Sequence, residues 1–210
     1  MRICIVEHHE LVRDAMCRLV DPIGEVVGTS TNGREAVRLA QETKPDLMLM
    51  DVALPELNGL DAGRQIKKDR QETRLIFVTC QTDLSFVREA FGLGASGYVL
   101  KQSSSSELLQ AIDEASDGNF YISSLIKKIL KAQRSSAGGR SNALFCVLTR
   151  RQREVLQLVA EGKTEKEIAS NLQISVTTVA FHKTHLKNQL KISTLAGLIR
   201  YAVEEGLVCQ

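Results

Sequence analysis

Residues 149–190 read TRRQREVLQLVAEGKTEKEIASNLQISVTTVAFHKTHLKNQL, and this pattern predicts helices joined by a tight turn. Gly162 ends a first run of apolar residues at helical spacing, and a short second run covers residues 167–172. Ile174 and Ser175 then lead into a longer helix that is polar on its outer face. Two helices joined in this way have the geometry that places the second helix in the major groove of DNA. The stretch therefore predicts a protein that acts by binding DNA.

The longer helix has an apolar side and a polar side. Successive residues turn by about 100°, so Val179, Leu186 and Leu190 fall on one side and should face the core. The residues predicted to face base edges are Thr177, Ala180, Phe181, Thr184, His185 and Asn188. The amide of Asn188 can pair with adenine, and the methyl group of Thr184 suits a thymine methyl. We therefore expect A·T character at the contacted base pairs.

Lysines around this helix are predicted to contact DNA phosphates. Lys183 and Lys187 lie on its flanks, and Lys163 and Lys166 precede it in the chain. Each such contact should steepen the salt dependence of binding by about 0.9 in the logarithmic slope. The alternative is that these lysines form only a solvated surface, as charged runs usually do.

The totals exclude several classes of protein. At 210 residues, the chain has room for one large domain or two ordinary ones. No apolar run approaches the roughly 18 residues of a membrane span, and the first residues form too short an apolar run for a signal peptide. The five cysteines are scattered and include no Cys-x-x-Cys pair, which argues against a disulfide framework or a zinc site. We therefore expect a cytoplasmic protein that does not act at a membrane.

Charge is distributed unevenly along the chain. Residues 1–126 carry a net charge of −6, residues 127–144 a net charge of +5, and residues 145–210 a net charge of +3. An acidic front and a basic rear indicate two tasks, with the rear nearer a polyanion such as nucleic acid. Asymmetries of this size are also common in proteins that bind no nucleic acid.

Short apolar runs alternate with helical patterns through the front of the chain. The runs predicted as strands are residues 3–6, 26–28, 47–50, 75–78 and 97–100, and a closing helix is predicted over residues 106–115. Fully apolar strands separated by helices indicate a parallel sheet that is covered on both faces. We therefore predict a five-stranded, doubly wound, flavodoxin-like α/β domain, followed by a small all-α helix-turn-helix domain.

The predicted domain boundaries follow the composition. The α/β domain takes residues 1–118, and the helix-turn-helix domain takes residues 146–210. Residues 119–145 are predicted as a linker helix and a flexible linker. Helical periodicity covers residues 120–133, and residues 134–142 are rich in Gly and Ser.

Polar side chains are expected to meet at one rim of the predicted sheet. Glu7 and His8 end the first strand, and Asp51 directly follows the third. Thr79 ends the fourth strand, and Lys101 follows the fifth. In an open parallel sheet, sites form beyond the carboxyl ends of the strands, near the point where the strand order reverses. A carboxylate, a hydroxyl and an ammonium suit acyl-phosphate chemistry, in which Asp51 attacks phosphorus beside a divalent cation. The alternative is that each residue only caps a loop.

The order of these parts is similar to that of a known family. Residues 1–117 resemble the receiver domain of bacterial response regulators. The matching stretches are IVEHHELVRDAM, VVGTSTNGREAVRLA, KPDLMLMDVALPELNGLDAGRQIK, LIFVTCQTD and GLGASGYVLKQ. The rear of the chain resembles the LuxR-type helix-turn-helix of the NarL/FixJ subfamily. Together the two resemblances cover nearly all of the chain outside the linker.

The resemblance implies roles for individual residues and partners. Asp51 is implied to be the phosphoacceptor, and Lys101 is implied to contact the phosphoryl group. Thr79 and Tyr98 are implied to form a switch pair, in which Tyr98 swings inward. The partners implied are double-stranded DNA and a sensor histidine kinase, and the outward part of a last helix, residues 194–208, is implied to join a homodimer on an inverted repeat. No enzymatic activity and no organic cofactor are expected.

The acidic pocket departs from the family pattern. The family opens with two acidic residues after the first strand, where this chain has Glu7 and His8. Magnesium prefers hard oxygen ligands, so we expect only weak magnesium binding through Glu7 and Asp51, and weak or absent phosphorylation of Asp51. The alternative is a conventional regulator that is activated by phosphorylation. A protonated His8 would repel the cation and pair with Asp51, which leaves a pH switch open. Cys80, beside Thr79, would crowd the entry of a phosphodonor.

Two alternatives belong to other functional classes. The same α/β fold carries flavin proteins and phosphatases, but the first strand is followed by Glu-His-His-Glu rather than by a glycine-rich phosphate loop. A protein-only adaptor that has lost DNA binding is the other alternative, because the groove face has few donors that read bases.

Overall fold

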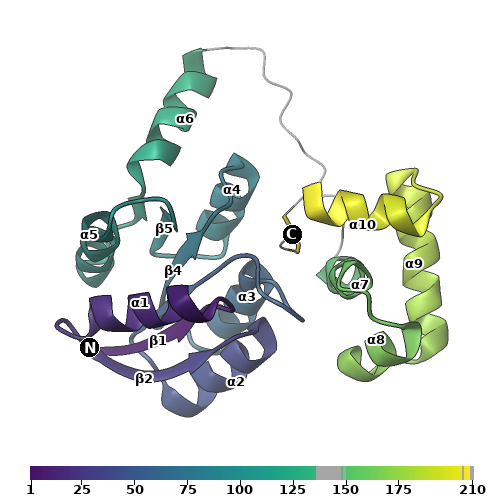
Figure 1. Ribbon diagram of the computed structural model, residues 1–210, viewed down its shortest axis with the longest axis horizontal. Coiled ribbons are helices and arrows are strands. Elements are labelled where there is room, and N and C mark those ends of the chain that lie inside the picture. The colour runs from purple at the N-terminus through teal and green to yellow at the C-terminus, as the bar shows by residue number, and fades with distance from the viewer. Residues whose placement is uncertain (136–147, 149, 205, 209–210) are drawn as a thin grey trace.

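The first part of the chain forms an α/β domain around a parallel sheet (Figure 1). The computed structural model describes residues 1–135, 148, 150–204 and 206–208. The strands are β1 (Arg2–Val6), β2 (Glu25–Ser30), β3 (Leu47–Met50), β4 (Arg74–Thr79), β5 (Gly97–Leu100) and β6 (Tyr121–Ile122), in the spatial order β2-β1-β3-β4-β5-β6. The helices are α1 (Glu10–Val20), α2 (Gly33–Thr43), α3 (Gly59–Asp69), α4 (Leu84–Gly92) and α5 (Ser105–Ser116). The strand order reverses between β1 and β3, which places the candidate site between these two strands.

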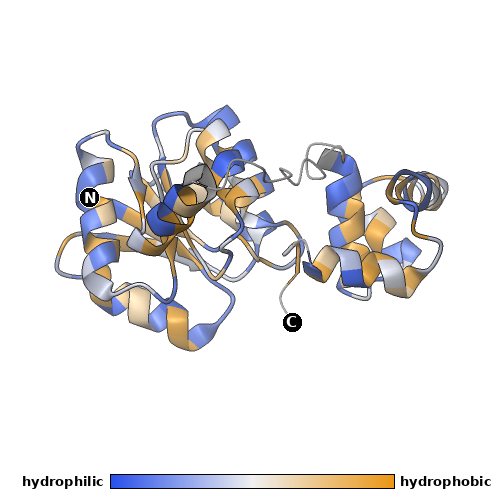
Figure 2. Cartoon of the chain, turned by 90° about the horizontal axis from the view of Figure 1, so that it is seen from above, coloured by the Kyte–Doolittle hydropathy of each residue, from blue (hydrophilic) through white to orange (hydrophobic). Residues whose placement is uncertain are grey.

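Alternate residues of each strand enter different cores. In β1, Ile3 and Ile5 pack with α1 and α5, whereas Cys4 and Val6 pack with α2, α3 and α4. This alternation follows from the two-residue period of a strand, and both sets are apolar because helices cover both faces. Figure 2 shows hydrophobic residues along the strands, and hydrophobic and hydrophilic residues alternating along the helices beside them.

Among the residues that the structure describes, the sheet has six strands, so the predicted number of five was wrong. The sixth, β6, pairs in parallel with β5 through Gly97 with Tyr121 and Tyr98 with Ile122. It lies within the stretch predicted to be helical from residue 120, and α6 (Ser124–Ser135) begins only after it. A strand of two residues is too short to show an alternating pattern, and its apolar residues continue the helical spacing of the helix that follows.

The loop after β3 folds tightly back on the strand that it leaves. The Gly59 N–H donates to the Val52 carbonyl at 2.8 Å, and a Cβ atom at Gly59 would lie 1.9 Å from the Asp51 carbonyl oxygen. Only glycine permits this approach of two backbone segments. The loop that carries Asp51 is therefore anchored at both ends.

The rear of the chain forms a separate all-helical core. Its helices are α7 (Arg150–Ala160), α8 (Glu165–Leu172), α9 (Val176–Leu190) and α10 (Leu195–Glu204). Val179 and Leu186 of α9 are fully buried against this core, and Leu190 is half-buried, as the helical wheel predicts. The last helix ends at Glu204 rather than at residue 208, and Gly206 then has a left-handed backbone, with φ of 65°.

Capping residues fix the turn between α8 and α9. Thr164 and Glu167 form a reciprocal capping box at the start of α8, and the Ser175 side chain accepts from the Thr178 N–H at the start of α9. Gln173 ends α8 with a left-handed backbone, with φ of 53°. These contacts fix the angle at which α9 leaves α8.

The predicted Gly/Ser-rich linker, apart from residues 134 and 135 at the end of α6, lies outside the described residues. Among the helices of the described parts of the chain, none combines the length and the apolar character required to cross a membrane.

Candidate functional site

Two carboxylates and one ammonium meet at the carboxyl ends of β1, β3 and β5. Lys101 Nζ lies 2.6 Å from Asp51 Oδ2 and 2.7 Å from Glu7 Oε2. Glu7 and Asp51 are buried, and the Lys101 side chain is only 12 % exposed. The other Asp51 oxygen, Oδ1, accepts a hydrogen bond from the Ala53 N–H at 3.2 Å. The structure thus brings together three of the residues that the sequence placed at this rim.

The charges of this cluster stabilise one another. Burial opposes a charged Lys101, but the carboxylates of Asp51 and Glu7 outweigh burial and raise the pKa of Lys101. Burial also opposes a charged Glu7, but the hydrogen bonds from Lys101 and His9 outweigh it and lower the pKa of Glu7. Lys101 and Glu7 therefore stay ionised at neutral pH.

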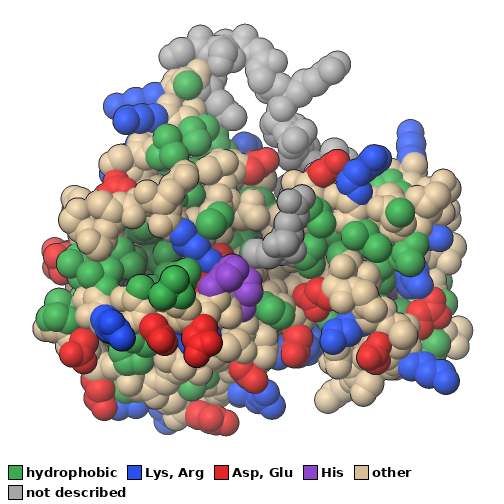
Figure 3. Space-filling model, viewed as in Figure 1, with side chains coloured by type: hydrophobic (Ala, Val, Ile, Leu, Met, Phe, Trp, Pro, Cys, Tyr) green, Lys and Arg blue, Asp and Glu red, His purple; other side chains and the backbone are tan. Residues whose placement is uncertain are grey.

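Two histidines lie against the buried Glu7. His8 Nδ1 lies 3.6 Å from Glu7 Oε1 and 4.0 Å from Asp51 Oδ2, and it has no hydrogen-bond partner within the described part of the chain. His9 Nδ1 lies 2.9 Å from Glu7 Oε1, and the centroids of the two imidazole rings are 3.7 Å apart. Desolvation and the neighbouring His9 lower the pKa of His8, which favours its neutral form. The His9 side chain is 54 % exposed, and histidine is visible on the surface of the α/β domain in Figure 3.

This set of residues fits magnesium poorly. Magnesium requires near-octahedral oxygen ligands at about 2.0–2.1 Å. The space between the Glu7 and Asp51 carboxylates holds the Lys101 ammonium, and the next side chain that faces them is the His8 imidazole. An ammonium and an imidazole thus stand where a tight magnesium site needs oxygen atoms.

The predicted switch residues are fully buried. Thr79 Oγ1 accepts from the Gln81 N–H at 3.3 Å, and the Tyr98 hydroxyl donates to the Gln81 carbonyl at 3.0 Å. The Tyr98 side chain already points inward in this structure, and burial raises the pKa of Tyr98, so it remains a neutral donor. Cys80 is exposed beside this pair.

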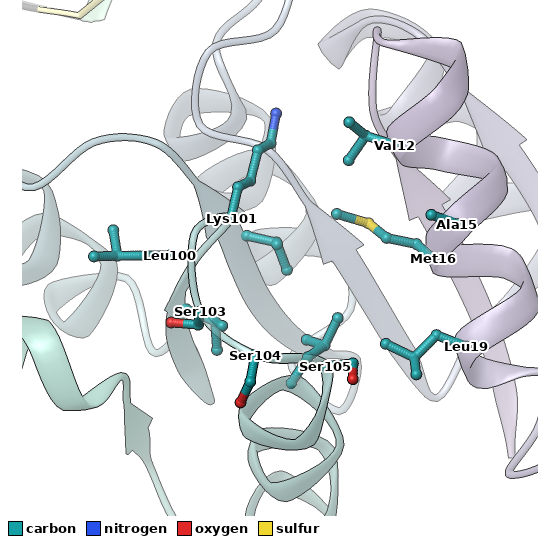
Figure 4. Close-up of a pocket in the computed structure, with 12 residues that line it drawn as sticks. Val12, Ala15, Met16, Leu19, Leu100, Lys101, Ser103, Ser104 and Ser105 are labelled. Carbon is teal, nitrogen blue, oxygen red and sulfur yellow. The ribbon is translucent and has the colours of Figure 1, made fainter.

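An apolar pocket lies between α1 and α5 (Figure 4). Its volume is about 270 Å³, and Met16, Leu19 and Leu108 form much of its wall. Ser103, Ser104 and the stem of Lys101 complete one side. The Lys101 side chain thus connects this pocket with the two carboxylates.

The predicted groove face of α9 is accessible in this structure. Thr177, Phe181, Thr184, His185 and Asn188 are exposed, and Ala180 is partly exposed. The Phe181 side chain is 65 % exposed, which is unusual for so large an apolar group. α9 lies on the side of its domain away from the receiver (right side of Figure 1). His185 is the most constrained member, because its Nδ1 lies 2.8 Å from the Gln152 side chain of α7.

The lysines predicted to contact phosphates differ in their exposure and in whether they already form an ion pair. Lys163 and Lys166 are exposed, and Lys187 is half-buried. Lys183 forms an ion pair with Glu165 at 2.7 Å, so it would have to exchange this partner for a phosphate. Arg151, at the start of α7, donates to Glu154 and to the Leu172 carbonyl and so holds α7 against α8.

The two domains are in contact through one face of α7. The Gln157 side chain is fully buried, and it donates to the Leu54 carbonyl at 2.7 Å and accepts from the Asn58 N–H at 2.8 Å. Glu161 Oε1 accepts from the Glu56 N–H at 3.0 Å. Leu54, Glu56 and Asn58 belong to the loop that directly follows Asp51. α7 and the residue after it, Glu161, therefore contact the loop that carries the candidate phosphoacceptor.

An ionic cluster extends this contact to α4. Arg153 of α7 lies 2.5 Å from Glu89, and Glu89 also pairs with Arg64 of α3. Asp61 accepts from Arg64 and lies 3.9 Å from Arg153. These contacts join α7 to two helices of the α/β domain as well as to the loop.

Sequence reasoning missed two parts of this arrangement. His9 received no role, although its position directly after Glu7 and His8 was a usable signal. Gln157 and Glu161 were also missed, because polar residues at the end of an apolar helix normally face solvent. No local sequence pattern indicates that another domain covers Gln157 and Glu161.

Comparisons with known families agree with the geometry. Residues 3–113 match the family described as the response regulator receiver domain, and residues 146–202 match the bacterial regulatory proteins of the luxR family. The transcriptional regulatory protein LiaR of Bacillus subtilis is 35% identical over 212 residues, which cover 99% of this chain and 99% of LiaR.

Solved structures share the fold of this chain in whole or in part. A two-component response regulator of the LuxR family from Aurantimonas sp. SI85-9A1 is 35% identical, with a TM-score of 0.61, over 64% of this chain and 98% of that chain. A structure of two RcsB dimers bound to two parallel DNAs is 21% identical, with a TM-score of 0.60, over 97% of this chain and 98% of that chain. At this identity, the second likeness shows the fold alone.

Proposed function

The chain belongs to the LuxR family of DNA-binding two-component response regulators, and from this membership we propose that it reads duplex DNA through α9 under a receiver that is phosphorylated weakly or not at all. The observation that carries the DNA part is the polar, exposed face of α9 around Phe181 and Thr184. A helix held at this angle by a short turn is suited to the major groove. DNA is a cytoplasmic ligand, so we propose that the protein acts in the cytoplasm. We also propose that the protein is not an enzyme.

We propose a homodimer on an inverted repeat. RcsB binds DNA as dimers, and the same fold is present here. On α10, Leu198 is buried in its own domain, whereas the Leu195 side chain is 49 % exposed. The exposed part of α10 supplies an apolar contact for a second copy, and two-fold symmetry then requires two half-sites of opposite orientation.

Weak phosphorylation follows from the pocket. The carboxylate of Asp51 is paired with Lys101, and an imidazole stands where the family has a second acidic residue. If a sensor histidine kinase acts on this chain, phosphotransfer to Asp51 should therefore be slow. A conventional, phosphorylation-activated regulator remains the competing proposal, because Asp51, Thr79 and Lys101 are all in place.

The contact between α7 and the Asp51 loop supplies the route from receiver to DNA. Any event that moves this loop changes the hydrogen bonds of Gln157 and Glu161. Release of α7 would free the DNA-binding domain to rotate and to pair with a second copy. A signal that moves this loop therefore changes how freely the domain that carries α9 and α10 can rotate.

Selection of binding sites from random duplex DNA tests the proposal. The full-length protein should enrich an inverted repeat with A·T pairs at the contacted positions, with similar sequences in the presence and absence of beryllofluoride. Asn188→Ala should relax the preference for adenine at one position per half-site, at a cost of about 1–3 kcal/mol. Asn119→Ala, in the receiver, is the matched control and should leave the site unchanged.

Three results would count against this reading. A folded protein that enriches no sequence would support the protein-only adaptor. Enrichment only with beryllofluoride would support the conventional regulator. A visible flavin spectrum or turnover of a phosphate ester would support an enzyme on the same fold.

A further inference from the structure

We propose that Glu7, His8 and His9 form a binding site for a divalent transition-metal ion that takes imidazole ligands, with zinc as the representative ion. The spacing of the cysteines argued against a zinc site, but the donors proposed here are two histidines and a glutamate, so that argument does not apply to them. The proposal goes beyond DNA binding, and metal binding can be measured whether or not the chain recognises DNA.

The three side chains already lie at the spacing of metal ligands. One donor atom from each lies within 4.8 Å of the donor atoms of the other two. Glu7 Oε1 lies 2.9 Å from His9 Nδ1 and 3.6 Å from His8 Nδ1. A tetrahedral zinc ion with bonds of about 2.0–2.1 Å places its donors about 3.3 Å apart, between these two distances. Only small side-chain rotations separate this arrangement from a coordinated one.

The two oxygens of Glu7 face different partners. Oε2 pairs with Lys101, which also pairs with Asp51, whereas Oε1 faces the two histidines. A metal ion on Oε1 therefore leaves the Lys101 contacts in place. This separation explains how one pocket can be poor for magnesium and still offer a complete donor set to another ion.

The donor types select the ion. Imidazole nitrogen suits zinc, copper, nickel and iron, whereas magnesium and calcium prefer oxygen. Two imidazoles and one carboxylate leave a fourth position for water, as in the zinc sites of several hydrolases. Asp51 Oδ2 lies 4.0 Å from His8 Nδ1, on the side of the site where that fourth position would open.

The two histidine nitrogens differ in their present partners: His9 Nδ1 contacts Glu7, which is itself a proposed ligand, at 2.9 Å. His8 Nδ1 is buried and has no hydrogen-bond partner among the residues that the structure describes. The His9 side chain makes no capping bond to α1, although His9 is the residue that precedes this helix. His9 Nδ1 becomes a ligand when its proton moves to Nε2, and the exposed ring leaves room for this tautomer. Bound metal would fix the start of α1 to the end of β1 beside the phosphoacceptor.

The test measures metal binding by the full-length protein after its metal has been removed with a chelator. A chromophoric zinc indicator competes with the protein for zinc, and cobalt(II) then reports the ligand type by its visible spectrum. We expect one zinc per chain that a large excess of magnesium does not displace, and a cobalt spectrum without a thiolate charge-transfer band. Zinc should also raise the melting temperature.

Variants separate this site from adventitious binding. Loss of a residue that only hydrogen-bonds to a metal ligand lowers metal affinity by about 10- to 100-fold. His9 is proposed as a direct ligand, so His9→Gln should weaken zinc binding at least about tenfold. The chain has four histidines, and the double variant His182→Gln with His185→Gln removes the other two as a matched control. His8→Asp should lower the affinity for zinc and raise that for magnesium. Cys80→Ser should change neither.

Four outcomes would overturn the proposal. These are the absence of zinc binding, displacement of zinc by magnesium at similar concentration, an unchanged affinity in folded His9→Gln, and a cobalt–thiolate band. Each is measured without DNA, so none of them bears on the DNA-binding proposal. Failure to select a DNA site would equally leave the metal site intact.

Discussion

Replacement of Gln157 by alanine should loosen the contact between the two domains without unfolding either one. The side chain makes two hydrogen bonds to the receiver backbone, to the Leu54 carbonyl and from the Asn58 N–H. An internal hydrogen bond contributes about 0.5–1.5 kcal/mol net, so loss of both should favour opening by about 1–3 kcal/mol. At about 1.4 kcal/mol for each factor of ten, the open population should rise about 5- to 150-fold.

Amide hydrogen exchange measured by NMR gives this population at single residues. The Asn58 amide is bonded to Gln157, whereas the Gly59 amide is bonded to the Val52 carbonyl inside the receiver at 2.8 Å. Gln157→Ala should accelerate exchange at Asn58 by the factor above and leave Gly59 unchanged.

A control variant and the contrary outcomes sharpen this test. Gln152→Ala also truncates a glutamine of α7, but the partners it removes, His185 and Gln189, belong to the DNA-binding domain. This variant should leave exchange at Asn58 unchanged. Equal acceleration at Asn58 and Gly59 would mean general loosening of the loop. No acceleration at Asn58 would mean that Gln157 does not hold the domains together.

Three further predictions concern DNA binding, the charge cluster and phosphorylation. Lys187→Ala should weaken binding to all duplexes alike and reduce the logarithmic salt slope by about 0.9, and a change confined to sequence preference would contradict a phosphate contact. Lys101→Met leaves two buried carboxylates unpaired and should cost about 3–5 kcal/mol in urea unfolding at neutral pH. The pKa of Glu7 is lowered from 4.5, so its stabilising contribution is complete above pH 4.5 and disappears as the pH falls through its folded-state pKa. The loss of unfolding free energy in Lys101→Met should therefore shrink in acid. A loss that does not depend on pH would contradict the ion pairs. Acetyl phosphate with magnesium should shift little wild-type protein on a Phos-tag gel, whereas His8→Asp should shift more, and a strong wild-type shift that Asp51→Asn abolishes would favour the conventional regulator.

The sequence predicted the features that local patterns encode. Continuous apolar runs such as residues 47–50 gave the parallel strands, because helices cover both faces of such a sheet. The helical wheel of α9 separated buried Val179 and Leu186 from exposed Phe181 and Thr184, because its helical period is regular. The rim residues followed from topology, since the carboxyl ends of parallel strands lie on one side of the sheet.

The sequence did not predict the features that depend on distant contacts. β6 exists because two residues pair with β5, and two residues carry no period. Gln157 is buried because the receiver loop covers it, and nothing near it in the chain encodes that loop. The pairing of Lys101 with both carboxylates likewise depends on side-chain geometry across three strands, which strand-end positions alone do not fix.

The backbone of Glu56 has consequences for how readily the regulator can change state. Its φ of 65° is left-handed, which costs a residue with a side chain about 1–2 kcal/mol, and its N–H is held by Glu161 of the other domain. The loop that Glu161 contacts therefore carries a local conformational cost in the docked form. Glycine adopts a left-handed backbone without that cost, so Glu56→Gly would remove it while leaving the N–H that Glu161 binds.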